Sequence, residues 1–157
     1  MFLVLLLAGV MAPSAICLQS NADFSGTWKQ SNERSTPTRT GNVVLHIDHR
    51  DPDMTVETTI RRGSAALRHA LQHYTTDGQA SISTGADGDE FRTSVVWSGQ
   101  GLIFSVEEHE DGRIILSRET WTLIVNGAAL ERCRERIGTQ DQAEKQKIIY
   151  LREAPKP

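Results

Sequence analysis

Apolar and polar residues alternate one by one along much of the chain after residue 41. Alternation with a period of two, in segments rich in Val, Ile, Thr and aromatic residues, is typical of β-strands that bury one face. The stretch before them, residues 30–41, is polar and shows no such alternation. Eight segments fit the pattern and predict an all-β chain: Asn42–His49, Met54–Arg62, Gln79–Thr84, Glu90–Trp97, Leu102–His109, Arg113–Val125, Ala129–Ile137 and Lys147–Arg152.

Short turn signals separate several of these segments. Asp-Gly and Asn-Gly pairs favour tight hairpins, because both central residues of such turns need a positive φ. A run of hairpins makes a meander, and a long meander closes into a barrel or sandwich because an open sheet would expose its edges. The signals are Asp77-Gly78, Asp87-Gly88, Asp111-Gly112 and Asn126-Gly127, with Ser98-Gly99-Gln100-Gly101 as a longer turn.

The turns also fix which residues oppose one another across neighbouring strands. The expected pairs are Glu119 with Arg134, Trp121 with Arg132, Phe104 with Glu119, and Trp97 with Leu102. A slip of one residue would exchange the two faces of the sheet, so the agreement of three separate turns constrains the register. The resulting interior face contains Phe91, Val95, Trp97, Leu102, Phe104, Val106, Ile115, Trp121, Leu123 and Leu130.

Charged residues also project from this interior face. One interpretation is structural: Glu119 and Arg134 neutralise each other across the strands, and Arg132 stacks on Trp121. The other is functional: two arginines against one glutamate leave a cation that could anchor a carboxylate or phosphate, with aromatic residues holding an apolar tail. The candidate ligand-binding residues on the cavity face are Arg132, Arg134, Glu119, Trp121, Phe104, Trp97 and Tyr150.

The segment Ser64–Tyr74 is ambiguous. Leu67, Ala70, Leu71 and Tyr74 recur at helical spacing behind a serine that could cap a helix. Strands on both sides favour a strand equally well, and the periodicity does not decide between them.

Several segments in order resemble a known family. Phe24-Ser25-Gly26-Thr27-Trp28 resembles the Gly-x-Trp opening strand of the calycin superfamily, the lipocalins and fatty-acid-binding proteins. Together with residues 45–52, 74–78, 121–123 and 147–150, it resembles a group of secreted bacterial lipocalin-like proteins of mostly unassigned function. The resemblance implies a single up-and-down antiparallel β-barrel of about 8–10 strands with an internal cavity, and a strand at 64–74.

One position departs from that family. Fatty-acid-binding proteins carry Arg-x-Tyr in the last strand to hold a carboxylate, whereas here Ile148 stands two residues before Tyr150. Their carboxylate site therefore does not transfer to that position.

The first residues predict export. Phe2 to Val10 is an apolar run, too short to span a bilayer and followed by small residues, as in a secretory signal peptide. We expect cleavage after Ala15 or Ala22, with residues 1–22 as the signal, 23–157 as one barrel domain, and a secreted or periplasmic mature protein. Cys133 then has a disulfide partner only if the earlier cut keeps Cys17.

Other classes of function find less support. The net charge of −3 is spread along the chain, which argues against a nucleic-acid partner. His69 and His73 would suit a metal only on a helix and lack a third ligand, and no catalytic constellation or cofactor motif is present. We expect a monomer without stable membrane insertion that binds a small hydrophobic or amphipathic molecule. The alternative is a non-catalytic structural or interaction protein of the cell envelope, whose barrel its own side chains fill.

Overall fold

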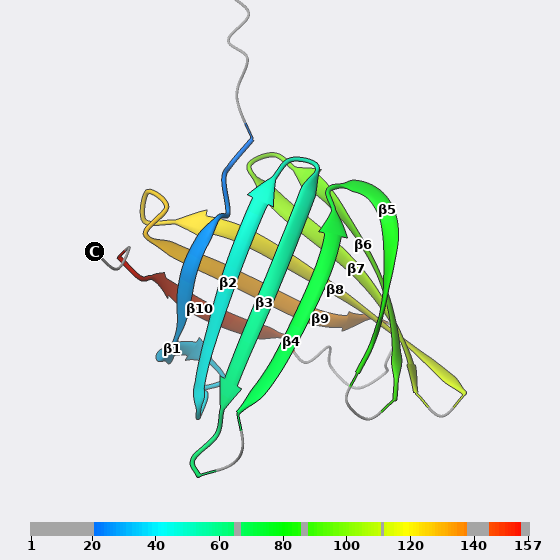
Figure 1. Cartoon of the computed structure of the whole chain (residues 1–157), viewed down its shortest axis with the longest axis horizontal. Coiled ribbons are helices and arrows are strands. Elements are labelled where there is room, and N and C mark those ends of the chain that lie inside the picture. Colours follow the sequence, from blue (N-terminus) through cyan, green and yellow to red (C-terminus); the bar gives the residue numbers. More distant parts are fainter. Residues whose placement is uncertain (1–20, 65–66, 86–87, 111, 138–144, 155–157) are drawn as a thin grey trace, which may run out of the picture.

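A computed structural model describes residues 21–64, 67–85, 88–110, 112–137 and 145–154. These residues form ten strands and no helix (Figure 1). The strands are β1 (Gly26–Thr36), β2 (Asn42–Arg50), β3 (Asp53–Arg61), β4 (Arg68–Thr75), β5 (Asp77–Thr84), β6 (Glu90–Ser98), β7 (Gly101–Glu110), β8 (Arg113–Ile124), β9 (Ala129–Ile137) and β10 (Gln146–Arg152).

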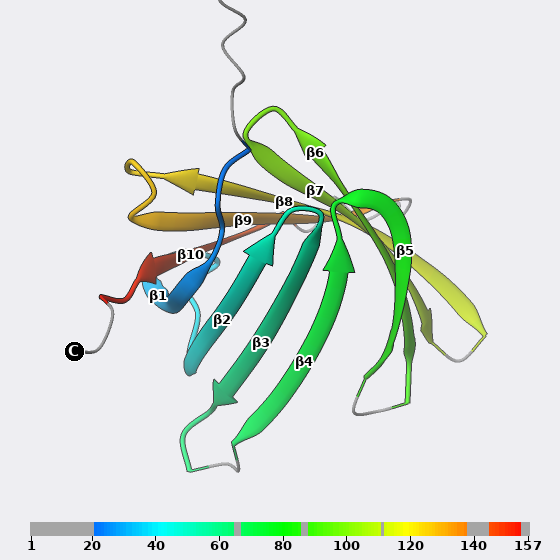
Figure 2. The same ribbon diagram turned by 45° about the horizontal axis from the view of Figure 1, so that its top comes forward.

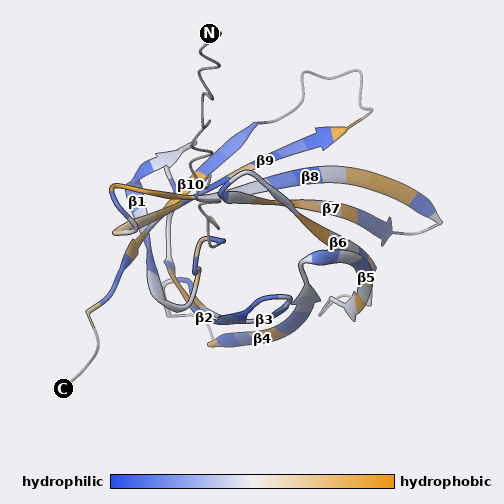
Figure 3. Ribbon diagram, turned by 90° about the horizontal axis from the view of Figure 1, so that it is seen from above, coloured by the Kyte–Doolittle hydropathy of each residue, from blue (hydrophilic) through white to orange (hydrophobic). Residues whose placement is uncertain are grey.

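The strands make one antiparallel up-and-down sheet that curls into a nearly closed barrel. Each strand pairs with its neighbour in sequence, except at one place, and β1 pairs with β10 to join the two ends of the meander. Seen from above, β2–β4 form one wall and β7–β9 the opposite wall, with β1 and β10 between them on one side (Figure 3). The predicted all-β, up-and-down antiparallel barrel of about 8–10 strands is therefore confirmed.

The exception is the seam between β4 and β5, which diverge from their shared turn (Figure 2). The prediction of a hairpin turn at Asp77-Gly78 is wrong, because these residues begin β5 and the turn lies at Thr76. The Asp77 carboxylate accepts hydrogen bonds from the Thr75 hydroxyl and the Gln79 amide. Gly78, at φ +87°, lies where the β5–β6 register shifts. The Asp-Gly pair thus bends the start of β5 instead of closing a hairpin with β4.

The predicted register of the later strands is confirmed. Glu119 opposes Arg134, Trp121 opposes Arg132, and Trp97 opposes Leu102. The ambiguous segment contains a strand, β4, which pairs with β3 over its whole length, so Leu71 faces outward instead of lining a helical stripe.

The first strand is longer than the alternation predicts. β1 continues through the polar stretch to Thr36, where its pairing with β10 is broken by a bulge between Ser31 and Thr36. The buried Ser35 hydroxyl replaces strand pairing for two backbone groups at this bulge: it donates a hydrogen bond to the Ser31 carbonyl and accepts one from the Ile149 amide. A bulge removes the regular alternation that marks a strand in sequence.

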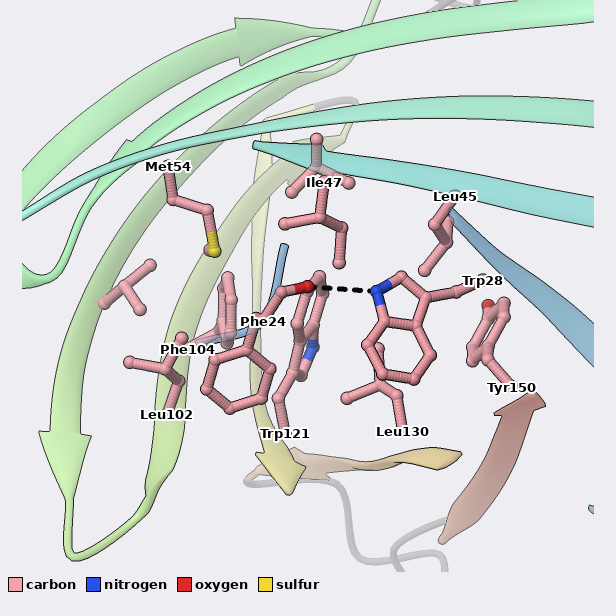
Figure 4. Packing of buried hydrophobic residues seen from close by; sticks show 12 residues of the cluster. Phe24, Trp28, Leu45, Ile47, Met54, Leu102, Phe104, Trp121, Leu130 and Tyr150 are labelled. Carbon is pink, nitrogen blue, oxygen red and sulfur yellow. Dashed lines mark hydrogen bonds between the residues drawn. The ribbon is translucent and has the colours of Figure 1, made fainter. Parts of the chain in front are cut away.

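One end of the barrel is closed by packed side chains. Phe24, just before β1, is fully buried, and its carbonyl accepts a 3.0 Å hydrogen bond from the Trp28 indole (Figure 4). Its ring centroid lies 6.1 Å from that of Trp97 and 6.5 Å from that of Trp121. We call this the closed end; residues 37–41 and 62–64 lie at the other end of the strands.

Some predictions fall on residues that are not described. The signal segment through residue 20, with Cys17 and the cleavage position at Ala15, is among them, as are Asp87 and Asp111. In the part of the chain that is described, no helix is long and apolar enough to cross a membrane.

Candidate functional site

A cavity of about 650 Å³ fills the barrel from its middle to the end opposite Phe24. Exposed residues of the loop at 37–40 take part in its lining, so the cavity communicates with solvent there. We call this end the mouth and the aromatic layer opposite it the floor. The lining residues come from all the walls: Gln30, Pro37, Thr38, Arg39, Thr40, Val43, Val56, Thr58, Ile60, Arg62, Gln72, Tyr74, Phe91, Thr93, Phe104, Val106, Glu119, Trp121, Arg132, Arg134, Gln146, Ile148 and Tyr150.

Aromatic rings form the floor. Phe104 and Trp121 are stacked, with centroids 4.5 Å apart, and the Tyr74 ring meets Phe104 edge-on at 5.4 Å. β7 and β8 place Phe104 and Trp121 on one face because side chains of a strand alternate between faces. Figure 4 shows Phe104 and Trp121 side by side, next to Phe24 of the closed end.

A buried ion pair borders the floor. The Arg132 guanidinium lies 4.5 Å above the Trp121 ring and donates from Nε to Glu119 Oε1, which also accepts a 2.6 Å hydrogen bond from the Trp121 indole. The interpretation in which the directly opposed Arg134 neutralises Glu119 is therefore wrong, whereas the stacking of Arg132 on Trp121 is confirmed. Stacking on Trp121 turns the long Arg132 side chain toward the next row of the ladder, where it reaches Glu119 diagonally.

The pair changes the acidity of the groups around it. Burial opposes ionisation of Glu119, but the charge of Arg132 and the hydrogen bonds from Arg132 and Trp121 outweigh it and lower the pKa of Glu119 below its usual value. Burial also disfavours the charged form of Arg132, but Glu119 raises the pKa of Arg132 above its usual value. Burial raises the pKa of the Tyr74 hydroxyl to about 12. Glu119 and Arg132 are thus both charged, and Tyr74 is neutral, at neutral pH.

Tyr150 also contacts this arginine. Arg132 Nη1 lies 3.4 Å from the Tyr150 hydroxyl, and Ile148 of β10, two residues before Tyr150, opposes Arg132 on β9. An arginine beside this tyrosine is thus supplied by the neighbouring strand, with its charge balanced by Glu119.

Three more arginines line the cavity nearer the mouth. Arg134 is held only loosely, with Nη2 at 3.9 Å from Glu108 and 3.4 Å from the Ser117 hydroxyl. Arg39 donates to Gln146, and its buried Nε has no hydrogen-bond partner among the described residues. Arg62 is exposed. Sequence reasoning missed Arg39 and Arg62 as cavity residues. Arg39 lies in the polar stretch that shows no alternation, and Arg62 was the last residue of the predicted strand Met54–Arg62 but follows the end of β3 at Arg61.

Six of the seven candidate residues line the cavity: Arg132, Arg134, Glu119, Trp121, Phe104 and Tyr150. Trp97 does not. It lies at the closed end, where its ring packs 5.7 Å from that of His49 and its indole donates to Asp51. His49 is buried beside it and likewise takes no part in the lining.

The histidines and the cysteine considered as metal ligands or nucleophiles lie on the outer face of the barrel. His69 and His73 are on the outer face of β4, bonded to Thr59 and Thr55, and no group of three or more potential metal ligands occurs in the described ranges. Cys133 lies on the exposed outer face of β9. Partial burial of its thiol there, together with the neighbouring Glu131 carboxylate, raises the pKa of the thiol. A raised pKa is the opposite of what an activated nucleophile needs.

Comparison with known proteins identifies the fold. No protein-family model and no curated protein sequence matches the chain. Among solved structures, it is similar to the REP1-NXSQ fatty acid transporter (TM-score 0.60, 13% identity, covering 84% of this chain and 97% of that one). It is also similar to secretory abundant heat soluble protein 4 from Ramazzottius varieornatus (0.61, 13%, 87% and 99%). A third is the Schistosoma mansoni fatty acid binding protein in complex with arachidonic acid (0.56, 12%, 83% and 96%).

Proposed function

We propose that this protein binds a small amphipathic molecule, with an apolar body and an anionic group, in the barrel cavity. The observation that carries the proposal is the composition of the lining: aromatic and aliphatic side chains with four arginines and one carboxylate, Glu119. The cavity volume of about 650 Å³ lies within the range of roughly 300–1,000 Å³ usual for small-molecule sites.

The similar structures support this class of ligand. Two of the three carry a fatty acid in their descriptions, as a transporter and as a complex with arachidonic acid. The cavity also favours binding over the alternative of a purely structural barrel, because a barrel filled by its own side chains would leave no such volume.

Titration with a fluorescent fatty-acid analogue tests the proposal. Thr93, a buried cavity-wall residue of β6, allows the cavity to be filled by Thr93→Phe. We expect saturable binding by the wild type and greatly weakened binding by this variant. The matched control is Ser94→Phe, which adds the same ring to the outer face of the same strand and should bind like the wild type. Thermal melts of all three proteins identify a variant that fails to fold. No saturable binding by the folded wild type across a panel of long-chain acids would refute the proposal.

We further propose that the protein acts outside the cytoplasm, as the apolar run from Phe2 to Val10 indicates. The intact mass of protein produced in its own host should correspond to loss of the segment through Ala15 or Ala22. A full-length protein that stays with the cytoplasmic fraction would contradict export while leaving the binding proposal in place.

A further inference from the structure

The charges of the cavity are divided between two depths. Along the β8–β9–β10 ladder, Trp121, Arg132 and Ile148 oppose one another in one row. Glu119, Arg134 and Gln146 oppose one another in the next row, two residues nearer the mouth, and the Glu119 carboxylate reaches back to Arg132 and Trp121 of the inner row. At 3.2–3.4 Å per strand residue, the Arg134 row is about 6–7 Å closer to solvent than the Arg132 row. Arg39 donates to Gln146 and therefore belongs to the outer depth.

The inner charge is already neutralised. Glu119 pairs with Arg132, so the two charges cancel, and the Trp121 indole and the Tyr150 hydroxyl complete the hydrogen bonding around the pair. An anionic group placed there would have to displace Glu119 or lie beside its charge without water. A desolvated like charge costs far more than the gain from one shared arginine. The floor therefore suits the apolar end of a ligand.

The outer charge is only partly neutralised. Arg39, Arg62 and Arg134 together carry +3, and the carboxylate nearest to them by ion-pair contact is Glu108, 3.9 Å from Arg134. Arg39 and Arg62 have no carboxylate within 4 Å in the part of the chain that the structure describes, and the buried Nε of Arg39 still lacks an acceptor. A carboxylate, sulfonate or phosphate at this depth would supply that acceptor and form charge-assisted hydrogen bonds.

We propose that the ligand enters with its apolar end first. The apolar end lies against Phe104 and Trp121, and the anionic group stays at the mouth between Arg39, Arg62 and Arg134. This inference rests on the proposed function, since it takes the cavity to be the binding site. It implies that the mouth arginines select for charge and that the floor selects only for apolar character.

The direction of binding can be measured with nitroxide-labelled stearic acids, used below their micelle-forming concentrations. All three tryptophans lie at the floor or the closed end, because Trp121 is in the floor and Trp28 and Trp97 lie beyond it. A nitroxide quenches a nearby ring, so we expect 16-doxyl stearate, labelled near its tail, to quench tryptophan fluorescence more strongly at saturation than 5-doxyl stearate. Stronger quenching by 5-doxyl stearate would overturn the orientation but not the proposed function. No saturable quenching by either would refute the proposed function itself.

A charge-removal variant tests the mouth arginines separately. Affinities are measured by competition, as the concentration of ligand that displaces bound 16-doxyl stearate. The double variant Arg39→Gln/Arg134→Gln should bind dodecanoate about tenfold or more weakly than the wild type. It should bind dodecanol, which has the same chain and no charge, within about twofold of the wild type. The control Arg92→Gln removes a positive charge from the outer face of β6 and should change neither affinity. Equal losses for acid and alcohol, or no loss for the acid, would show that these arginines do not hold the anionic group.

Discussion

The indole nitrogen of Trp97 donates a 2.8 Å hydrogen bond to the carboxylate of Asp51, although the two residues are 46 positions apart. The same carboxylate accepts hydrogen bonds from the Thr76 hydroxyl and the Asn21 side chain. Asp51 thus joins the β2–β3 turn to the β4–β5 turn and to β6. This link crosses the seam, where no strand pairing holds the two edges together in the described chain.

The charge of Asp51 should stabilise the fold only above its pKa. Hydrogen bonds from Thr76 and then Trp97 lower the pKa of Asp51 below the usual 3.8. A lowered pKa in the folded state gives stability that is present above the unfolded-state pKa and lost as the pH falls through the folded-state pKa. Asp51→Asn keeps an accepting oxygen but no charge. In urea unfolding, we expect the wild type to be more stable than this variant at about pH 6, and the difference to shrink as the pH falls below the usual pKa of 3.8 and through the lower folded-state pKa. A difference that does not change over this pH range would show that the charge is not what stabilises the link.

The buried pair at the floor should behave as a unit. Glu119→Leu leaves Arg132 charged and buried without a partner, and we expect a loss of about 3–5 kcal/mol of unfolding free energy. The double variant Glu119→Leu/Arg132→Met removes both charges and should recover most of the loss. Chemical denaturation of both variants measures this difference.

Arg134→Met is the matched control for that experiment. Arg134 is the residue directly opposite Glu119 on the ladder, but its only ionic contact among the described residues, with Glu108, is at 3.9 Å. It should cost less than about 1 kcal/mol. A larger loss for Arg134→Met than for Arg132→Met would favour the directly opposed pair instead of the diagonal one.

Trp97 and Trp121 should differ in their contribution to stability. Trp121 is 3% exposed and contacts Phe24, Phe104 and Arg132, so Trp121→Ala should cost about 3–5 kcal/mol. Trp97 is only partly buried at the closed end, and Trp97→Ala should cost less. Equilibrium unfolding of both variants measures the order, and a loss below about 1 kcal/mol for Trp121→Ala would contradict the packing of the floor.

The bulge in β1 should depend on one hydroxyl. Ser35 is buried and bonds the Ser31 carbonyl and the Ile149 amide, so Ser35→Ala leaves both backbone groups without that partner. We expect a loss of about 1–3 kcal/mol. Ser105→Ala, at an exposed position of β7, should change stability by less than about 0.5 kcal/mol. Similar small effects at both sites would mean that water replaces the Ser35 hydroxyl in the bulge.

The sequence predicts this fold well where turns and alternation act together. Between β6 and β9, the turns fix the register, and the register places Phe104 and Trp121 on the cavity face. The same logic does not predict which side chains bond. Opposition on the ladder concerns Cα positions, whereas Arg132 spans to a diagonal partner because a long side chain can stack on Trp121 and still reach Glu119.

The features that were missed belong to irregular backbone. The bulge around Ser35 interrupts the alternation, so the second half of β1 could not be recognised in the sequence. The Asp77-Gly78 pair predicts a local bend, but which strands pair on either side of the bend depends on distant residues. Arg39 and Arg62 come to the cavity from loops, where no period assigns an inside and an outside. Sequence reasoning therefore located the floor of the candidate site and Arg134, but not the two loop arginines at its mouth.

The seam between β4 and β5 leaves the circumference of the barrel unfixed by hydrogen bonds. In a fully closed barrel, the number of strands and their stagger set the diameter. Here the chain joins the two edges at Thr76, at the closed end, and the edges diverge toward the other end (Figure 2). The walls can spread there without breaking a ladder between these edges. If the cavity binds ligands as proposed, we expect the barrel to accept ligands of different width, so that the charge of a ligand, rather than its width, decides which ligands bind.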